Sequence, residues 1–276
     1  MQHTIIESKK GKGRFDFKEF IKYKDLLYFM VLRDVTVVYK QSVLGFAWAV
    51  INPVFSMLVF TIVFGRLAGV PSDGIPYPIF SYAALIPWTY FSNTLNTSGT
   101  SLINNSSIFT KVYFPRLIIP LTPVLSKLVD LSISFILLLV LMIYYQFFPT
   151  FKIFLILPLI VLLVMTAAGM GSWLSALALQ YRDVKFGITF AVPLLMYAAP
   201  VVFPASLIMQ KLGYKIYLLY GLYPLTGIIE GFRAAVIPSK AIPWDLIGMS
   251  AIGAILIFTF GLFVFKRFEN RFADVA

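Results

Sequence analysis

Residues 43–64 limit what this 276-residue chain can fold into, because they contain no Asp, Glu, Lys, Arg or His. About 20 mostly apolar residues suffice to cross the hydrocarbon core of a bilayer as a helix. Inside that core the backbone must satisfy its own polar groups, so only helices and closed barrels span it. Residues 43–64 are therefore predicted to form a membrane-spanning helix.

The segment just before this stretch is basic and amphipathic. Its apolar side chains recur at helical spacing, while its charged side chains fall mostly on other faces. Such a helix either packs on a soluble core or lies in the membrane surface. The second alternative is favoured, because the chain offers little soluble protein to pack against. The apolar set is Phe17, Phe20, Ile21, Tyr28, Val31, Leu32, Val35 and Val38.

The composition argues against a soluble enzyme. Hydrophobic residues make up 59% of the chain, charged residues 13%, and the mean hydropathy is +0.86. These values describe a chain whose solvent is mostly lipid. Since there is no cysteine and the one histidine, His3, lies in a polar terminus, no metal site or histidine-based catalysis is expected. The first fifteen residues lack the apolar core of a cleaved signal peptide.

Five more charge-poor stretches bring the predicted spans to six. A further apolar segment, residues 216–229, contains Gly221 and Pro224 and is too short to cross, so it suits a re-entrant or interfacial helix. The predicted fold is an all-α polytopic membrane protein with an N-terminal interfacial helix and short re-entrant helices between spans five and six. The spans are placed at about 43–64, 79–103, 117–148, 153–179, 186–205 and 246–265.

The distribution of Lys and Arg predicts the orientation. Sixteen lie in residues 1–40, in the loops after the second and fourth spans and at the C-terminus, and six lie on the other side. Six spans with both termini in the cytoplasm satisfy this asymmetry. The net charge of +11 then reflects topology and attraction to anionic headgroups, and no nucleic-acid motif accompanies it. The organisation is a cytoplasmic tail with an interfacial helix (1–42), a transmembrane domain (43–268) and a second tail (269–276).

Motifs for covalent chemistry are missing from the sequence. It contains no phosphate-binding loop, nucleophile elbow or zinc-protease motif, so the chain is expected neither to bind ATP nor to be an enzyme. A membrane enzyme should gather acidic residues at one face, but Asp73, Glu230 and Asp245 are scattered. A secondary transporter should show internal repeats, and none is evident.

Polar residues are crowded in the second predicted span. Asn93, Thr97 and Thr100 share one helical face. They serve either as polar contacts between helices or as the wall of a water-accessible path for a polyhydroxylated substrate. In the third span, Lys127 and Asp130 are three residues apart and are predicted to pair.

Aromatic residues precede this polar face. Rings of this kind either anchor a helix at the bilayer interface or stack on the apolar faces of sugars. A path of rings and neutral hydroxyl groups would suit a glycan better than an ion. The aromatic set is Tyr77, Phe80, Tyr82, Trp88, Tyr90 and Phe91.

The loop at residues 104–116 combines helix-cap residues, aromatic rings and two cations. A short cytoplasmic helix that displays Phe109, Tyr113 and Phe114 would be suited to docking another protein. Alternatively, these rings lie among the lipid headgroups. Pro115 ends the element before the next span.

Four blocks of sequence are specific as a set. They are Arg33-Asp34-Val35 with Tyr39-Lys40-Gln41-Ser42-Val43-Leu44-Gly45-Phe46-Ala47-Trp48 and Asn52-Pro53, then Lys111-Val112-Tyr113-Phe114-Pro115-Arg116, Tyr181-Arg182-Asp183-Val184, and Pro224-Leu225-Thr226-Gly227-Ile228-Ile229-Glu230-Gly231-Phe232-Arg233. In order and topology the chain resembles the membrane subunit of bacterial ABC-2 type polysaccharide exporters, most of all the permease for lipid-linked O-antigen. Teichoic-acid and capsule permeases are the alternatives.

The resemblance implies a homodimer in the bacterial inner membrane, bound to two copies of a separate ATPase that holds ATP and Mg. Lipid-linked polysaccharide would pass between the protomers into the periplasm, and residues 206–236 would form the periplasmic gate. Coupling to the ATPase is expected of Asn105, Ile108, Phe109, Lys111, Tyr113, Phe114 and Arg116. The gate helix and lipid headgroup site would use Arg33, Tyr39 and Lys40. The glycan path would be lined by Phe46, Trp48, Trp88, Tyr90, Phe91, Asn93, Thr97 and Thr100.

Overall fold

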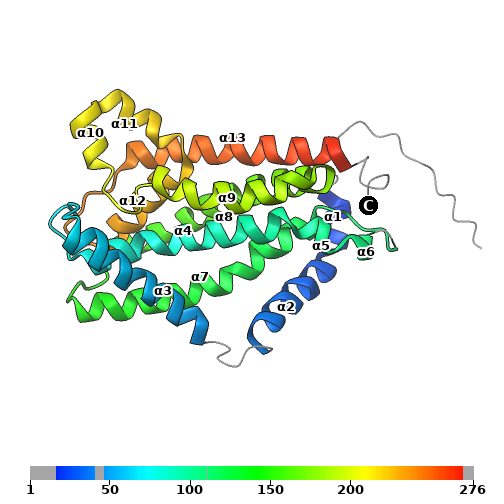
Figure 1. Cartoon of the computed structure of the whole chain (residues 1–276), viewed down its shortest axis with the longest axis horizontal. Helices are drawn as coiled ribbons and strands as arrows, with labels where there is room; N and C mark the ends of the chain where they lie inside the picture. The colour runs from blue at the N-terminus through cyan, green and yellow to red at the C-terminus, as the bar shows by residue number, and fades with distance from the viewer. Residues whose placement is uncertain (1–16, 41–46, 110, 270–276) are drawn as a thin grey trace, which may run out of the picture.

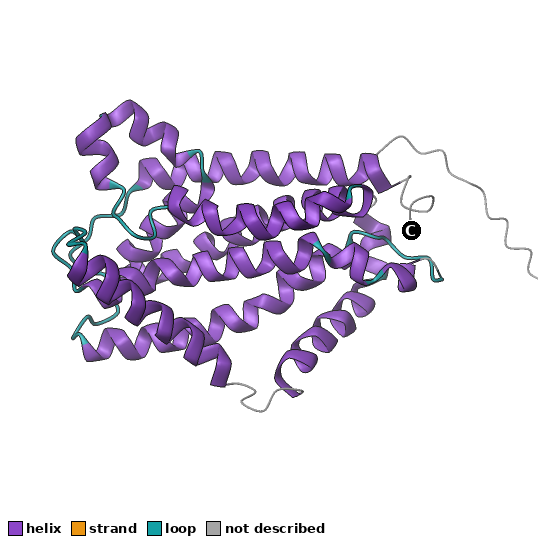
Figure 2. Cartoon of the chain, viewed as in Figure 1, coloured by secondary structure: helices purple, strands orange, loops and turns teal. Residues whose placement is uncertain are grey.

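The fold is known from a computed structural model that describes residues 17–40, 47–109 and 111–269. Over these residues every regular element is helical (Figure 2), which confirms the all-α part of the predicted fold class. Helices are the expected solution for a chain this apolar, since each helix satisfies its own backbone hydrogen bonds.

Long helices run along the long axis of the molecule, and short helices gather at its two ends (Figure 1). The long helices are α3 (Trp48–Phe60, continued by a π-helix, Thr61–Leu67), α4 (Tyr77–Gly99), α7 (Ile118–Tyr144), α8 (Ile156–Gln180, preceded by a 3₁₀ helix, Phe151–Leu155), α9 (Arg182–Ala198) and α13 (Trp244–Glu269). One end, here named the basic end, carries α1 (Phe17–Lys22), α2 (Lys24–Lys40), α5 (Ser101–Asn104) and α6 (Ser106–Phe109). The other, the hairpin end, carries α10 (Ser206–Leu212), α11 (Tyr214–Gly221) and α12 (Pro224–Val236).

In the described part of the chain, four helices are long and apolar enough to cross a membrane. The chain is therefore a multi-pass membrane protein. Helix α4 is also long enough, about 35 Å at 1.5 Å per residue, but it is more polar. Helix α9 has 17 residues. The four apolar helices are Trp48–Leu67, Ile118–Tyr144, Phe151–Gln180 and Trp244–Glu269.

Helix α4 lies inside the bundle and packs against α7, α8, α12, α3 and α9. Three of its buried hydroxyl groups bond to the backbone of α7. The Tyr82 hydroxyl donates to the Ser134 carbonyl at 3.0 Å, the Tyr90 hydroxyl to Val124 at 2.8 Å, and Ser98 Oγ to Pro120 at 2.7 Å. These side chains thus act as polar contacts between helices.

Helices α8 and α13 approach each other closely through glycine. A Cβ atom added to Gly261 would lie 2.0 Å from the Gly169 carbonyl oxygen, and one added to Gly169 would lie 2.5 Å from the Phe258 Cα. Because lipid gives apolar helices little reason to associate, backbone approach through small residues is a main source of their packing energy. The glycine pair therefore sets the distance between α8 and α13.

Three of the differences between the predicted segments and the structure have a clear physical cause. The third predicted span extends to residue 148, but α7 ends at Tyr144, shortly before Gln146 at a φ of 60°. The fifth extends to residue 205, but α9 ends at Ala198, because Pro200 forces Ala199 into an extended conformation. The apolar segment at 216–229 contributes to two helices instead of one, because α11 ends at Gly221 and Pro224 begins α12.

The glycine contact gives a direct test of the packing. We expect Gly261→Val to separate α8 from α13 and to cost about 2 kcal/mol of stability or more. The matched control is Gly248→Val on the same helix, since a Cβ there meets nothing within 4 Å. The thermal unfolding midpoint of the detergent-solubilised protein would fall only for Gly261→Val. Equal midpoints for the two variants would show that this contact does not set the packing.

Candidate functional site

Helix α2 lies at the basic end and presents two apolar sides. On the inner side Met30 is buried in a cluster that also contains Ile118 and Phe265, from α7 and α13. On the outer side Tyr28, Phe29 and Leu32 remain exposed. Large apolar side chains exposed together on an amphipathic helix are typical of contact with a membrane surface.

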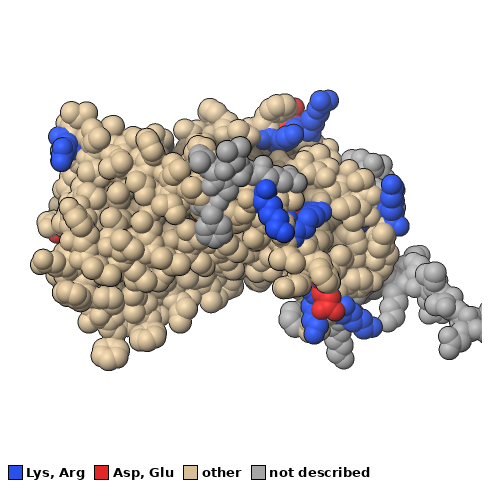
Figure 3. Space-filling view, turned by 90° about the horizontal axis from the view of Figure 1, so that it is seen from below, with Lys and Arg blue, Asp and Glu red and all other residues tan. Residues whose placement is uncertain are grey.

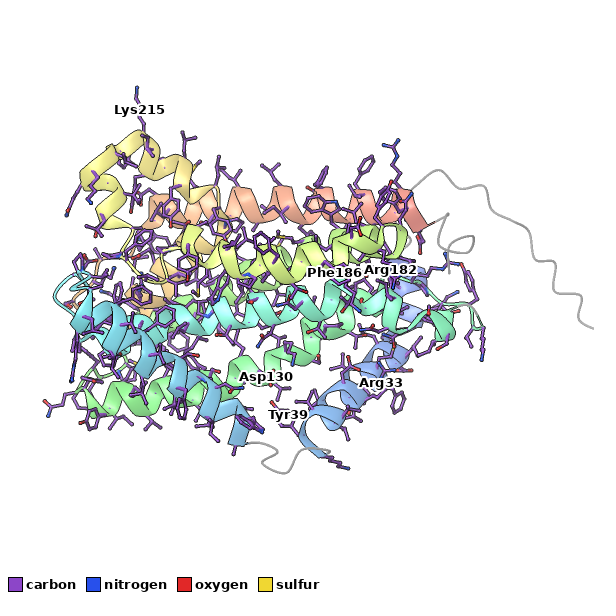
Figure 4. The ribbon with its side chains drawn as sticks, viewed as in Figure 1. Arg33, Tyr39, Asp130, Arg182, Phe186 and Lys215 are labelled. Carbon is purple, nitrogen blue, oxygen red and sulfur yellow. The ribbon has the colours of Figure 1, made fainter. Side chains whose placement is uncertain are left out.

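Polar contacts hold α2 to the bundle, among them those of Arg33 and Tyr39 (Figure 4). Arg33 Nη2 donates to Asn105 Oδ1 at 3.3 Å, and the Tyr39 hydroxyl donates to the carboxylate of Asp130 on α7. Burial, followed by the hydrogen bond to this carboxylate, raises the pKa of Tyr39. The same carboxylate accepts from Lys127 Nζ at 3.1 Å, which confirms the predicted pair.

The residues predicted for the headgroup site differ in whether their charge is compensated by a neighbouring carboxylate. Arg33 Nη2 lies 2.8 Å from Asp34 Oδ1, so the Arg33 charge is compensated within its own helix. Lys40 is exposed at the end of α2. A cavity of about 360 Å³ lies between α2, the α4–α5 region and α7, and Arg33 and Tyr39 are among its walls.

The predicted coupling loop has inward and outward residues. Phe114 is 3% exposed and packs in the cluster of Met30 and Ile118. Its assignment as a displayed docking ring is therefore wrong, because Phe114 anchors the loop. Arg116 also points inward, with Nη1 donating to the Glu269 carbonyl at 2.7 Å.

Lys111 and Tyr113 face outward, and Tyr113 is 78% exposed. Asn105 is half-buried, where it accepts from Arg33, and Ile108 packs against the apolar cluster. The backbone of Phe109 ends α6, and its side chain lies outside the described residues. The outward surface available for docking is thus centred on Lys111 and Tyr113.

The aromatic residues assigned to a glycan path are inside the protomer. Trp88, Tyr90 and Phe91 are 6%, 2% and 0% exposed and belong to the main core. In this conformation they offer almost no accessible surface to a substrate, because other helices cover the part of α4 that carries these rings. The physical reason is packing: large rings fill the gaps between α4 and its neighbours.

The polar residues of the predicted path lie nearer the surface. Asn93 and Thr97 are exposed, and Thr100 is half-buried. Trp48, at the start of α3, is exposed. Phe46 lies outside the described residues. An accessible polar strip therefore runs along α4 from Asn93 to Thr100.

A buried ion cluster lies at the hairpin end and was not predicted from the sequence. Arg233 is fully buried, with Nη1 2.8 Å from Glu230 Oε1. Arg233 Nη2 donates to the Val201 carbonyl at 2.9 Å and its Nε donates to the Phe80 carbonyl at 3.2 Å. Its guanidinium also lies 3.6 Å over the Phe80 ring. The spacing of three residues between Glu230 and Arg233 was a signal for this pair.

Lys240 extends the cluster to the surface. Its Nζ lies 2.9 Å from Glu230 Oε2 and 3.0 Å from Asp73 Oδ2, and Asp73 also accepts from Ser206 Oγ at 2.9 Å. Burial alone would raise the pKa of Glu230, but the charges of Arg233 and Lys240 lower it below its ordinary value. The cluster joins α12 to the loop before α4 and to the start of α10.

These features define a class of protein: a polytopic helical membrane protein whose accessible polar groups form a loop surface, a cavity and a strip along one helix. The family model for the ABC-2 type transporter matches residues 25–237. The chain belongs to the ABC-2 type transporter family. It is a membrane permease subunit, and such subunits lack ATPase activity of their own.

Relatives are matched over nearly the whole chain. The chain is 27% identical over 260 residues to the O-antigen export system permease protein RfbA of Myxococcus xanthus, covering 93% of this chain and 97% of that protein. It is 27% identical over 252 residues to the RfbA of Klebsiella pneumoniae, covering 91% and 95%. The polysialic acid transport protein KpsM of Escherichia coli is 22% identical over 245 residues, covering 87% and 92%.

The buried cluster makes a strong prediction for stability. We expect Arg233→Met to cost at least about 3 kcal/mol, because it leaves the carbonyls of Val201 and Phe80 without a donor and removes a partner of Glu230. Arg233→Lys should not restore stability, because a single ammonium group cannot replace the several N–H donors of the planar guanidinium. The measurement is the thermal unfolding midpoint in detergent.

Arg66→Met is the control, because Arg66 is exposed and its loss should change stability by no more than about 0.5 kcal/mol. The double variant Arg233→Met with Glu230→Leu should lose less stability than the sum of the losses in the two single variants. In the double variant no buried carboxylate is left without its Arg233 partner. Strictly additive effects would show that the two side chains do not act as a pair.

Proposed function

We propose that this chain is the transmembrane subunit of an ATP-driven exporter that moves lipid-linked polysaccharide of the O-antigen type from the cytoplasm to the periplasm. The observation that carries the proposal is the similarity to O-antigen export permeases over more than nine-tenths of the chain. The more distant similarity to a polysialic acid transport protein favours a capsule-type glycan as the second candidate.

The proposed topology has six spans, namely α3, α4, α7, α8, α9 and α13, with both termini in the cytoplasm of a bacterium. The charge distribution supports it. On the face seen in Figure 3, Lys and Arg side chains gather at the basic end and are almost missing from the other half. By the positive-inside rule the basic end is cytoplasmic. The short helices of the hairpin end then lie on the periplasmic side, where they form the gate.

The proposed assembly is a homodimer with two copies of an ATPase subunit, which hold ATP and Mg. The outward residues Lys111 and Tyr113 would contact the ATPase. The inward residues Phe114 and Arg116 would transmit its movement, because they pack on α7 and on the end of α13. ATP binding can open the path only if the ATPase binds the open and closed states with different affinity.

The proposed function is tested in the bacterium from which the gene for this chain is deleted. Lipid-linked polysaccharide should accumulate in the cytoplasm and disappear from the cell surface, and a plasmid copy of the gene should restore it. The chemical composition of the accumulated polymer distinguishes an O-antigen from a capsule glycan. Normal surface glycan of every kind in the deletion strain would refute polysaccharide export.

The coupling surface gives a sharper prediction. We expect Lys111→Glu and Tyr113→Ala to reduce both glycan export and the ATPase rate of the complex by about tenfold, since each alters an exposed contact residue. Lys215→Glu is the control, because Lys215 is exposed on α11 at the opposite end (Figure 4). ATP hydrolysis by the purified complex in nanodiscs is the measurement. Wild-type rates in both loop variants would remove the coupling role from this loop.

A further inference from the structure

The cavity at the basic end shares Asn104 and Asn105 with the predicted coupling loop, but not the exposed residues Lys111 and Tyr113. It is enclosed on one side by α2 and on the others by α7 and the α4–α5 region, and its volume is about 360 Å³. That volume lies at the lower end of the range of small-molecule sites, roughly 300–1,000 Å³. Figure 4 shows Tyr39 and Asp130 facing each other between α2 and α7.

The fixed charges in the cavity wall cancel. Two cations and two carboxylates line it, and each cation is paired with a neighbouring carboxylate: Arg33 with Asp34 at 2.8 Å, and Lys127 with Asp130 at 3.1 Å. Lys40 is not among the lining residues. A pyrophosphate group would bring further negative charge next to two carboxylates, with no uncompensated cation among the described lining residues to offset it.

The hydroxyl groups in the wall are available mainly as acceptors. Thr97 Oγ1 donates its proton to the Asn93 carbonyl at 2.5 Å, and Thr122 Oγ1 donates to the Ile118 carbonyl at 2.9 Å. Since a hydroxyl group has one proton, only the lone pairs of these oxygens remain for a ligand. The amide of Asn104 adds an acceptor oxygen and donors, with only a 3.5 Å contact to Thr100.

An acceptor-rich, charge-balanced wall selects its ligand by hydrogen bonding. An ionised phosphate can only accept hydrogen bonds, so it could use the remaining N–H groups of Arg33, Lys127 and Asn104 but would be repelled by the lone pairs of the hydroxyl and carboxylate oxygens. Each hydroxyl group of a sugar can donate to such oxygens and accept from the Asn104 amide. Apolar residues in the wall, Val35, Val38 and Ile119 among them, offer contact to the C–H face of a sugar ring.

We propose that this cavity binds a neutral sugar residue of the lipid-linked substrate, and that the pyrophosphate stays outside it. The inference rests on the proposed function and specifies which chemical part of the substrate α2 recognises. It also revises the role expected of Arg33, which shapes the wall through Asp34 and Asn105 instead of pairing with phosphate.

The test compares carriers with and without a sugar. The purified complex of this chain with its ATPase, in nanodiscs, is titrated with bare polyprenyl pyrophosphate and with the same carrier bearing one glucose, galactose or N-acetylglucosamine. Binding is read by native mass spectrometry. We expect at least one sugar-bearing carrier to bind about tenfold or more tightly than the bare carrier. Loss of one acceptor in Thr97→Val should weaken that binding about 3- to 10-fold and leave the bare carrier unchanged.

Thr189→Val is the matched control, because Thr189 on α9 is also exposed and donates to the carbonyl four residues earlier, Lys185, at 3.2 Å. Asn104→Leu is a second cavity variant and should act in the same direction. Equal binding of all carriers, tighter binding of the bare carrier, or equal weakening of both by Thr97→Val would overturn the inference. The gene-deletion experiment tests export itself, so a failure of one proposal can be told from a failure of the other.

Discussion

A buried segment that leaves the helical path must still satisfy the carbonyl groups that it frees, and Arg233 does this for the turn after α9. Helix α9 ends at Ala198, and most of the next seven residues are buried although they lie outside a helix. Arg233 donates to the carbonyl of Val201 and, at 3.4 Å, to that of Phe203. The planar guanidinium suits this role, because its five donors lie in a fixed fork. The hairpin end as a whole depends on this side chain.

Different interactions hold the two ends of the bundle together. At the hairpin end, α10 and α11 share only a small apolar cluster around Tyr217 and Leu246, and polar contacts through Asp73 and Ser206 add to it. Elements with few buried apolar contacts open at low free-energy cost, as a gate requires. At the basic end, an apolar cluster that includes Met30 and Phe114 joins α2, the coupling loop and α7. A rigid connection of this kind suits the transmission of movement.

Local signals predicted the helices well, because charge-free stretches and helical periodicity depend only on nearby residues. The Lys127–Asp130 pair followed from spacing within one helix. The burial of Trp88, Tyr90 and Phe91 could not be predicted from the sequence. Aromatic residues are common in belts at the bilayer interface, in substrate paths and in protein cores alike. Pairings between distant segments, such as Arg33 with Asn105, have no local sequence pattern at all. The adjacency of Arg33 and Asp34 was visible in the sequence, however, and could have argued against Arg33 as a phosphate ligand.

The buried rings change how a glycan path along α4 must work. With the rings covered, the accessible wall is the strip from Asn93 to Thr100, and Thr97 belongs both to that strip and to the cavity. The cavity is thus continuous with one end of the strip. Neutral hydroxyl and amide groups bind each sugar weakly, and weak, repeated sites allow passage because no single site holds the polymer. Under the proposed function, recognition is confined to the cavity at α2, and the strip serves movement.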